Sequence, residues 1–338
     1  MRKVAELDPM LGGTLIHHVL ETVMKKHTGK AFAELSEKDL QREIDIVLFS
    51  YMDNFMGGKE RVTDRFYYLF SRMRKVIMSL FERLKAEFSQ SDFEPCDFEL
   101  NIGDDERVDS FKIELENGQI EFIGQVDRVD KMDLDGKRYI RIVDYKTGTK
   151  TFQLGDVFSG FNMQMLLYLI CIWRTGKKDY ENIVPSGVLY FPANLASFNS
   201  ERGDSEEKRK LKALSLGRMN GMLVNDGVAI EHMDKEKTGL FLPVKYDKKT
   251  GQVKGDFITI KQLEKLGEII DRTIRKMGEA LHSGVVSATP VFQKAYKDTC
   301  SYCDFKDVCL NENPKNNFVK KYTHDECLRM LGAGEDIE

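Results

Sequence analysis

Two short segments near the middle of the chain contain the residue types that phosphodiester hydrolysis requires. Residues 123–130 read Ile-Gly-Gln-Val-Asp-Arg-Val-Asp, and residues 142–148 read Ile-Val-Asp-Tyr-Lys-Thr-Gly. Side chains alternate between the two faces of a strand, so we expect Asp144 and Lys146 on one face and Tyr145 on the other. The neighbouring strand would bring Asp127 beside them, which would place two carboxylates and an ammonium group at one end of a sheet.

This group of charges fits metal-assisted chemistry. Two carboxylates at close range repel each other, and a divalent cation resolves that repulsion. Mg²⁺ or Mn²⁺ can lower the pKa of a bound water and polarise a phosphoryl oxygen, while a lysine stabilises charge on phosphorus or orients the water. An Asp-x-Lys triplet alone is more often a charged turn on a solvated strand. Together with the Gly-x2-Asp-Arg-x-Asp segment before it, the triplet instead favours a metal-dependent site.

Two further elements could complete such a site. Gln164 and Tyr168 are four residues apart, so they share one face of an expected helix and could hold a nucleotide or support Lys146. On an apolar helix such residues are usually packing edges. His17 could reach the carboxylates and act as a metal ligand, but a lone histidine is more often structural, and His18 beside it is an alternative.

Three cysteines near the C-terminus suit a soft metal centre. Cys300, Cys303 and Cys309 have the spacing Cys-x2-Cys-x5-Cys, which lets thiolates converge on an iron-sulfur cluster or on zinc. Free buried thiols are the alternative interpretation of the three. A fourth ligand is required, and the other cysteines are Cys96, Cys171 and Cys327. Six cysteines in 338 residues are too few for a disulfide framework, which favours a reducing cytosol.

Composition excludes several classes of protein. The chain is 41% hydrophobic and 31% charged, which excludes a disordered or collagen-like protein and is enough for about two domains. The net charge of −4 argues neither for nor against a polyanionic partner, because a basic groove can coexist with an acidic exterior. The apolar stretch at 161–173 is shorter than the roughly 20 residues of a membrane span, and the first six residues lack a signal-peptide core. We therefore expect a cytoplasmic protein without a membrane partner. The sequence contains no Gly-x4-Gly-Lys-Ser/Thr phosphate loop.

The N-terminal quarter of the chain is expected to be helical. Residues 12–90 contain a capping box at 36–39 and an apolar period of three to four residues along 62–88. The other face of that last helix is basic, and we interpret it as a solvated face rather than a phosphate-tracking surface. Its basic residues are Arg61, Arg65, Arg72, Arg74, Lys75, Arg83 and Lys85.

Four β-rich runs follow Pro95 and predict an antiparallel meander, because Asn117-Gly118 and Asp135-Gly136 supply hairpin turn signals between them. The runs are 98–102, 111–115, 119–130 and 138–146.

A crossover is expected after the meander. Residues 158–173 predict an apolar helix and residues 187–191 a buried strand, and this order implies a right-handed crossover and a mixed central sheet. Residues 197–210 are expected to be a mobile loop. A small hairpin region around 248–251 and a helix over 263–281, ended by Gly284, complete the expected elements.

Taken in order, the motifs resemble the RecB-like branch of the PD-(D/E)XK nucleases. They are Gly-x3-His at 13–17, Gly-x2-Asp-Arg-x-Asp at 124–130, Asp-Tyr-Lys-Thr-Gly at 144–148, Gln-x3-Tyr at 164–168 and Cys-x2-Cys-x5-Cys at 300–309. Five motifs in the same order over nearly the whole chain make the resemblance specific. Within this branch the chain is most similar to the C-terminal nuclease region of AddB-type subunits of bacterial ATP-dependent helicase-nucleases. Residues 218–227, with Met233-Asp234 after them, resemble that subunit's insertion before the last helix.

The resemblance implies an α/β fold with a restriction-endonuclease-like PD-(D/E)XK core, in which helices flank a central mixed β-sheet. A helical insertion and a C-terminal cysteine-rich segment would be added to this core. The implied domains are an N-terminal helical segment at 1–95, a nuclease core at 96–195, an insertion loop and hairpin at 196–260, and a C-terminal helix with an iron-sulfur segment at 261–338.

The resemblance also implies roles for individual residues. His17, Asp127, Asp144 and the carbonyl of Tyr145 would hold Mg²⁺ or Mn²⁺, and Asp127, Asp144 and Lys146 would be catalytic. Gln164 and Tyr168 would belong to an active-site helix that contacts DNA.

The cysteine segment would hold a [4Fe-4S] cluster that attaches the C-terminus to the nuclease fold. Cys300, Cys303 and Cys309 would supply three of its four ligands. In the family the remaining cysteine lies upstream of the Gly-x3-His helix, whereas the first cysteine here is Cys96. We therefore expect the sequence to begin inside the family's nuclease region, with the cluster incomplete in this chain alone.

The implied function is a metal-dependent DNA exonuclease that acts 5′-to-3′ on single strands during double-strand-break processing, while a helicase/nuclease partner subunit unwinds DNA with ATP. One alternative is a CRISPR-associated RecB-like nuclease, but those chains tend to be shorter, and the helical insertion at 36–90 argues against it. The other is a DNA-binding or scaffolding module with a vestigial site. The presence of Asp127, Asp144 and Lys146 argues against that alternative.

Overall fold

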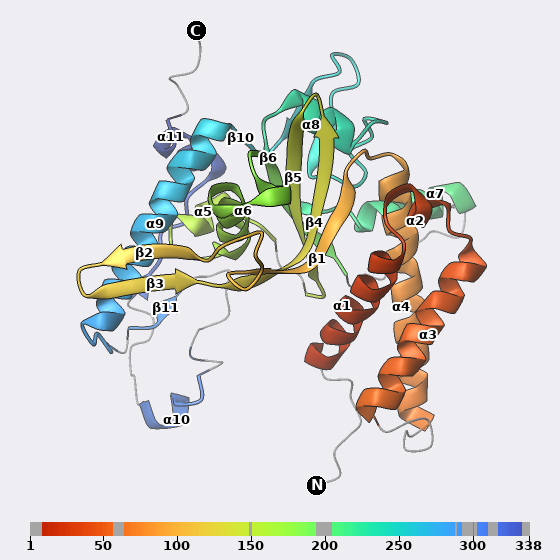
Figure 1. Cartoon of the computed structure of the whole chain (residues 1–338), viewed down its shortest axis with the longest axis horizontal. Helices are drawn as coiled ribbons and strands as arrows, with labels where there is room; N and C mark the ends of the chain where they lie inside the picture. The colour runs from red at the N-terminus through yellow and green to blue at the C-terminus, as the bar shows by residue number, and fades with distance from the viewer. Residues whose placement is uncertain are drawn as a thin grey trace. The chain divides into compact units, whose positions relative to one another are not determined.

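A computed structural model of the chain describes residues 9–56, 64–148, 151–193, 205–287, 289–292, 300, 303–309 and 317–332 (Figure 1). The chain divides into two compact units. The first comprises Met1–Ser110, Ile123–Phe152 and Tyr168–Ile260, and the second comprises Phe111–Phe122, Gln153–Leu167 and Lys261–Glu338.

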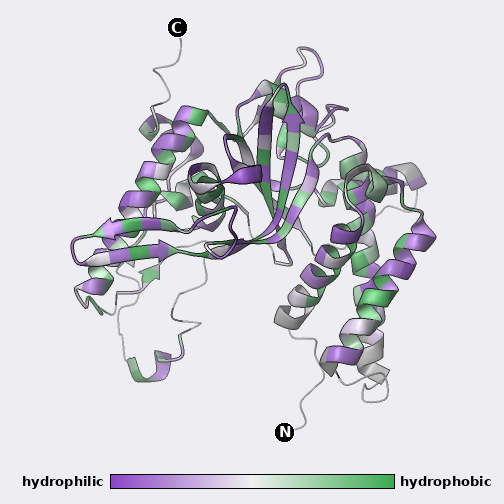
Figure 2. Cartoon of the chain, in the orientation of Figure 1, coloured by the Kyte–Doolittle hydropathy of each residue, from purple (hydrophilic) through white to green (hydrophobic). Residues whose placement is uncertain are grey.

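The N-terminal part of the first unit is helical, as predicted. Its helices are α1 (Pro9–Lys26), α2 (Gly29–Glu34), α3 (Glu37–Met56) and α4 (Asp64–Ser89). The predicted cap of α3 is present, because the backbone N–H of Asp39 donates to Ser36 Oγ at 3.1 Å. Both apolar and polar residues occur along α3, as an amphipathic helix requires (Figure 2).

A six-stranded mixed sheet forms the centre of the first unit, in the order β1-β4-β5-β6-β7-β10. Its strands are β1 (Glu94–Ile102), β4 (Gly124–Leu134), β5 (Lys137–Lys146), β6 (Ile183–Pro192), β7 (Asn220–Val224) and β10 (Phe257–Ile258). β5 and β6 run parallel, whereas β1, β4 and β5 pair antiparallel. The expected α/β fold with a mixed sheet flanked by helices is therefore confirmed.

The predicted meander was wrong in its pairing. β1 pairs with β4, while β2 (Phe111–Leu115) and β3 (Gly118–Phe122) form a separate hairpin that belongs to the second unit. Turn signals specify only local pairing, and the β1–β4 pairing joins segments about 30 residues apart for which no local signal exists. The Asp135-Gly136 turn was predicted correctly, whereas the other turn lies at residues 116–117, one residue before the predicted Asn117-Gly118. Asp135 and Gly136 both have positive φ, 51° and 73°, as a two-residue turn of this kind requires.

The predicted crossover is present, but its helix is shorter than expected. Instead of one helix over 158–173, the chain forms α5 (Leu154–Val157) and α6 (Gln164–Thr175). Gly160 and Asn162 interrupt the helix with φ of 81° and 52°, and the Asn162 amide donates to Asp156 at 2.7 Å. An Asn that adopts left-handed geometry and bonds locally competes with helix formation, which explains the shift.

The region after β6 contains more regular structure than the sequence predicts. Residues 197–204 of the expected mobile loop lie outside the described residues, but its end was predicted wrongly, because α7 (Glu206–Leu216) begins there. Ser205 caps this helix by accepting a hydrogen bond from Lys208 N at 3.2 Å. Farther on, α8 (Gly227–Met233) follows β7, and β8 (Val244–Tyr246) pairs with β9 (Val253–Gly255) as the predicted hairpin.

The second unit is built around the β2–β3 hairpin and α9 (Ile260–His282), which ends as predicted before Gly284, whose φ is 69°. A Cβ on Gly278 of α9 would lie 2.2 Å from Ile120 Cδ1, so glycine permits the close approach of helix and hairpin. The remaining elements are α10 (Lys306–Cys309), α11 (His324–Met330), β11 (Val291–Phe292) and β12 (Asn317–Phe318).

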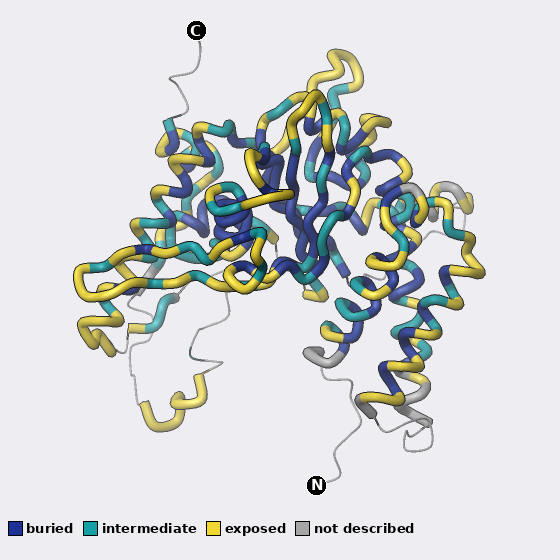
Figure 3. The backbone as a smooth tube through the Cα atoms, viewed as in Figure 1, coloured by how far each residue is buried: buried dark blue, intermediate teal, exposed yellow. Residues whose placement is uncertain are grey.

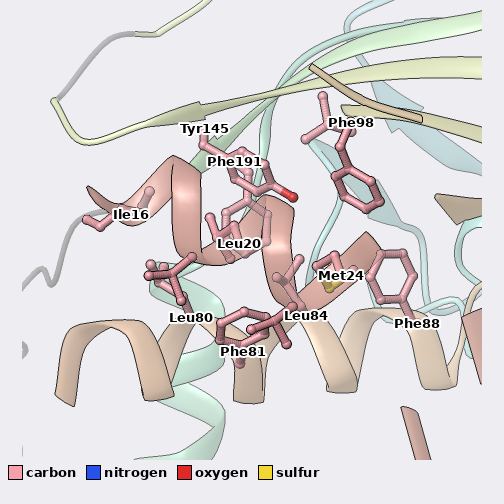
Figure 4. Close-up of a cluster of buried hydrophobic side chains, with 14 of the residues drawn as sticks. Ile16, Leu20, Met24, Leu80, Phe81, Leu84, Phe88, Phe98, Tyr145 and Phe191 are labelled. Atoms are coloured by element: carbon pink, nitrogen blue, oxygen red, sulfur yellow. The ribbon is translucent and has the colours of Figure 1, made fainter. Parts of the chain in front are cut away.

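The core of the first unit lies between the sheet and helices α1 and α4. Figure 4 shows apolar side chains of α1 and α4 packed against each other and against rings from the sheet. The labelled members are Ile16, Leu20, Met24, Leu80, Phe81, Leu84, Phe88, Phe98, Tyr145 and Phe191. β5 and β6 are buried along most of their length (Figure 3), as central strands covered on both faces must be.

The basic face of α4 is solvated only in part. Arg72 and Lys75 are exposed, as predicted, but Arg83 is 6% exposed and donates to the carbonyl of Pro192 at 3.0 Å. The prediction was wrong for Arg83, because the long guanidinium side chain folds into the interior and lies over the Phe191 ring. The side chains of Arg61 and Arg65 lie outside the described residues. Within the described part of the chain, no helix is both long and apolar enough to span a bilayer.

Candidate metal and phosphodiester site

The ends of β4 and β5 bring the predicted acidic residues to one place. Arg128 pairs with Val143, so Asp127 and Asp144 occupy the next positions on these antiparallel strands. The Lys146 ammonium donates to Asp144 Oδ1 at 2.7 Å and lies 5.5 Å from the centroid of the Tyr190 ring. The expected side-by-side placement of Asp144 and Lys146 is therefore present.

Three residues from three elements form a compact group of possible metal ligands. His17 of α1, Glu99 of β1 and Asp127 of β4 each offer a ligand atom, and these atoms lie within 4.8 Å of one another. His17 Nδ1 is 3.5 Å from Asp127 Oδ2 and 3.8 Å from Glu99 Oε1. We call these three residues the imidazole-carboxylate group.

Sequence reasoning missed Glu99. It belongs to no motif, and its strand contains other acidic residues that do not reach the site. Its backbone is unusual, since Glu99 has φ of 53° inside β1, a left-handed conformation that is uncommon for a residue other than glycine. Such strain persists only where the surrounding structure enforces it, and it often marks functional positions.

The backbone of Tyr145 links the two sides of the site. Its N–H donates to Asp127 Oδ2 at 2.9 Å, and its carbonyl accepts a hydrogen bond from His17 Nε2 at 3.1 Å. His17 and the Tyr145 carbonyl, which were predicted to belong to the same site, therefore lie within hydrogen-bonding distance of each other. His18 points elsewhere, because its ring lies 5.6 Å from that of Tyr51.

Burial and mutual repulsion perturb the acid-base properties of this site. Burial, together with the negative charge of Asp144, raises the pKa of Asp127 to about 7. Burial lowers the pKa of His17, but the neighbouring carboxylates of Glu99 and Asp127 outweigh that effect, so the pKa is raised. A carboxylic acid that ionises near neutral pH beside a second carboxylate is typical of a functional site.

The donor set fits a divalent cation. The carboxylates of Glu99 and Asp127 and the Tyr145 carbonyl are oxygen ligands of the kind that suits Mg²⁺ and Mn²⁺. For ligands about 2.1 Å from an octahedral ion, adjacent donors lie about 3 Å apart and opposite donors about 4.2 Å apart. The separations of 3.5 and 3.8 Å from His17 Nδ1 to the Asp127 and Glu99 carboxylates fall within that range. Binding of the ion would also relieve the repulsion that raises the Asp127 pKa.

Comparison with protein families agrees with this geometry. The family model described as the PD-(D/E)XK nuclease superfamily matches residues 1–310. The chain belongs to this superfamily. The predicted resemblance at this level is confirmed.

Curated relatives narrow the likeness within the PD-(D/E)XK superfamily. The chain is 29% identical to a Clostridioides difficile protein named as a subunit of an ATP-dependent helicase/deoxyribonuclease, over 350 residues that cover 98% of this chain and 30% of the relative. It is also 29% identical to proteins of the same name from Clostridium novyi and Acetivibrio thermocellus, covering 94% and 100% of this chain and 29% and 30% of those relatives. The chain thus spans about three-tenths of the length of these relatives.

Gly124, the glycine of the Gly-x2-Asp motif, contacts Tyr168, the tyrosine of the Gln-x3-Tyr motif. A Cβ on Gly124 would lie 2.4 Å from Tyr168 Cε1, a distance that real Cβ atoms do not reach. Tyr168, which is 6% exposed, therefore packs where only glycine leaves room. Gln164 begins α6, is exposed and belongs to the second unit, so its part in the site stays a prediction.

The predicted cluster ligands form no disulfide. Cys303 N donates to the carbonyl of Cys300 at 3.3 Å, and Cys309 N donates to that of Phe305 at 2.8 Å, so turns shape this segment. Cys303 and Cys309 are exposed, whereas Cys327 is buried in α11. The iron-sulfur cluster stays a prediction.

Proposed function

We propose that this chain is a metal-dependent deoxyribonuclease domain that acts as an exonuclease and hydrolyses phosphodiester bonds of DNA. One observation carries the proposal: the imidazole-carboxylate group lies at the strand ends that also present the paired Asp144 and Lys146. A purely structural role would not require a carboxyl group whose pKa is raised to about 7 by burial beside another carboxylate.

The residues of the site would divide the work as follows. His17, Asp127, Asp144 and the Tyr145 carbonyl would hold the ion, and we add Glu99 to this set. When bound, Mg²⁺ or Mn²⁺ would lower the pKa of a coordinated water and neutralise charge on the phosphoryl oxygens. Lys146 would place its positive charge beside the phosphate as negative charge develops there. Asp144 and the face of the Tyr190 ring would hold that ammonium group in position.

Tyr168 and Gln164 would support this chemistry from α6. Tyr168 packs against Gly124, three residues before Asp127, so it would fix the strand that presents this carboxylate. Gln164 would contact DNA.

The name of the curated relatives supports a wider role. They are named as subunits of an ATP-dependent helicase/deoxyribonuclease, so we propose that this chain acts on DNA ends in double-strand-break repair beside a partner that unwinds DNA with ATP. The same likeness favours this role over a CRISPR-associated nuclease. We also propose that Cys300, Cys303 and Cys309 hold an iron-sulfur cluster, since three thiols spaced two and five residues apart suit such a centre.

Digestion of DNA labelled at one end tests the function. The purified chain is incubated with single-stranded and duplex DNA in the presence of Mg²⁺, Mn²⁺ or EDTA, and the products are resolved by length. We expect cleavage that requires the metal and that proceeds from an end, and the position of the label gives its polarity.

A matched pair of variants assigns that cleavage to the site. Asp144→Asn removes the charge that holds Lys146, whereas Asp135→Asn makes the same chemical change in the exposed turn before β5. Asp144→Asn should abolish cleavage while Asp135→Asn retains it. If the unchanged chain binds DNA but never cleaves it with either metal, the vestigial binding module is the better description.

A further inference from the structure

Two buried arginines and two buried acids lie behind the site, on the other face of β4 and β5. Arg128, Asp130 and Arg141 are 0% exposed, and Glu87 of α4 is 1% exposed. Arg128 Nη2 donates to Asp130 at 2.9 Å, Arg141 Nε donates to the same oxygen at 2.8 Å, and Arg141 also donates to Glu87. We call these four residues the buried ion network.

The charges of this network balance, but its position requires an explanation. Burying four charged groups is expensive, and replacing such a set with apolar residues is often neutral or stabilising. A network of this kind is therefore weak support for a role in stability alone. Its arginines belong to the strands that hold Asp127 and Asp144, which suggests that it specifies geometry.

One hydrogen bond leads from the network to the site. Arg128 Nη1 donates to the Tyr145 hydroxyl at 3.1 Å. The guanidinium carbon lies 5.6 Å from the centroid of the Tyr145 ring and 5.2 Å from that of Phe88, so two aromatic rings border the guanidinium. The Tyr145 ring is thus held at its tip and by its neighbours on the core side of β5.

The backbone of the same tyrosine faces the candidate metal ligands. Its N–H donates to Asp127 at 2.9 Å, and its carbonyl accepts from His17 at 3.1 Å. These two groups flank the Tyr145 Cα, so a displacement of that Cα would move a donor away from Asp127 and an acceptor away from His17. The orientation of Tyr145 therefore bears on two ligands at once.

We propose that Arg128 is a positioning residue that fixes the backbone of Tyr145 through the tyrosine hydroxyl, and thereby sets the metal affinity of the site. This inference rests on the proposed metal-dependent function. Arginine suits the role, because its planar fork can bind Asp130 through two nitrogens while a third reaches the tyrosine. A lysine ammonium offers no such rigid set of donors.

The variant Tyr145→Phe isolates this hydrogen bond. It removes one oxygen, keeps the ring contacts with His17 and Phe191, and leaves the ion pairs of the network in place. Tyr139→Phe is the matched control, because Tyr139 is a buried tyrosine on the same face of the same strand, six residues away. Mn²⁺ binding to each metal-free variant is measured by calorimetry, without DNA and without turnover.

We expect Tyr145→Phe to weaken Mn²⁺ binding about tenfold, the size of effect seen when support of a metal ligand is removed. Tyr139→Phe should bind Mn²⁺ like the unchanged chain. In the cleavage assay, Tyr145→Phe should raise the Mn²⁺ concentration for half-maximal rate by a similar factor while the KM for DNA stays constant. A role in stability alone would lower the melting temperature without this change in metal affinity.

Arg128→Lys provides a second, dependent test wherever that variant folds. If Arg128 acts through the hydroxyl, adding Tyr145→Phe to Arg128→Lys should weaken Mn²⁺ binding no further. Equal Mn²⁺ affinity of Tyr145→Phe and the unchanged chain would overturn the positioning role and leave the proposed function standing. Failure of the unchanged chain to bind Mn²⁺ and to cleave DNA would overturn the proposed function and this inference with it.

Discussion

The imidazole-carboxylate group and the cysteine segment are two candidate metal sites of opposite construction. The first consists of His17 from a helix and Glu99 and Asp127 from two strands, and His17 and Asp127 are more than 100 residues apart in sequence. Its ligand atoms lie close together without a bound ion. The second places three thiols within ten residues of sequence. Cys303 and Cys309 are exposed there, and none of the residues of α10 is buried (Figure 3).

This difference shows what orders each site. The sheet and the core beneath it hold the imidazole-carboxylate group before any ion binds, at the expense of repulsion that raises the Asp127 pKa. The described residues of the cysteine segment, Cys300 and 303–309, are not buried and have no comparable support, so binding of the metal itself would have to supply the order of this segment. The first site should therefore depend on single side chains of the fold, and the second on its metal.

Replacement of Lys146 should have the largest effect on DNA cleavage. A small effect would contradict the view that the first site depends on single side chains of the fold. Lys146→Met removes the charge beside Asp144 and should reduce the rate of DNA cleavage by about 100- to 1000-fold, the scale of a lost charge-stabilising group. Lys137→Met, an exposed lysine at the start of the same strand, serves as the control. Comparable activity of both variants would remove Lys146 from the chemistry.

Glu99→Gln tests the ligand that sequence reasoning missed. The variant keeps the size of the side chain but removes a negative charge 3.8 Å from His17, so Mn²⁺ affinity should fall by about 10- to 100-fold. Calorimetry on the metal-free chain measures the change. Glu94→Gln, at the exposed start of the same strand, should bind like the unchanged chain, and equal binding by both variants would show that the ion is held without Glu99.

The contrast between Glu99 and Asp127 explains how far the sequence could predict the site. Asp127, Asp144 and Lys146 lie on two strands joined by a tight turn, so alternation and turn chemistry are enough to place them together. Glu99 reaches them only through the β1–β4 pairing and through a left-handed backbone within β1. Neither feature leaves a local signal in the sequence.

The same distinction applies to the fold. Periodicity and turn residues predicted the N-terminal helices, the crossover and the mixed sheet, because each of these follows from local pattern. The separation of the β2–β3 hairpin from the sheet and the burial of Arg83 depend on tertiary packing. Arg128 and Asp130 stood in a predicted motif, but only the structure shows that they bind each other at 0% exposure.

The pH dependence of metal binding sharpens the claim that the first site is preformed. The pKa of Asp127 is raised to about 7, so an ion must displace a proton at lower pH, and Mn²⁺ affinity should fall by about tenfold per pH unit below 7. The raised pKa of His17 adds to this slope. Calorimetry between pH 6 and 8 measures how Mn²⁺ affinity changes with pH, and Asp127→Asn should make this change smaller. An affinity that does not vary over this range would contradict the buried, repelling carboxylates.

The metal-free chain should show the linked change in stability. A pKa raised in the folded state stabilises that state at low pH, and this contribution is lost as the pH rises from about 4 through about 7. The melting temperature of the metal-free chain should therefore fall over this range, by the equivalent of a few kcal/mol at most. Mn²⁺ should restore much of the loss at pH 8. A melting temperature that rises over the same pH range would contradict the raised pKa of Asp127.

Removal of the exposed thiols should have the smallest effect on the first site. In the double variant Cys303→Ser and Cys309→Ser, two of the three predicted cluster ligands in this chain are lost, so the iron and sulfide content after anaerobic reconstitution should fall below that of the unchanged chain. Cys96→Ser is the control, because the serine hydroxyl can keep the hydrogen bond to the Val129 carbonyl. Mn²⁺ affinity of the double variant should change by less than about twofold, since the sheet and not the cysteine segment orders the carboxylates. A loss of Mn²⁺ binding together with iron would mean that the two sites are coupled, and that the carboxylate geometry depends on the cysteine segment after all.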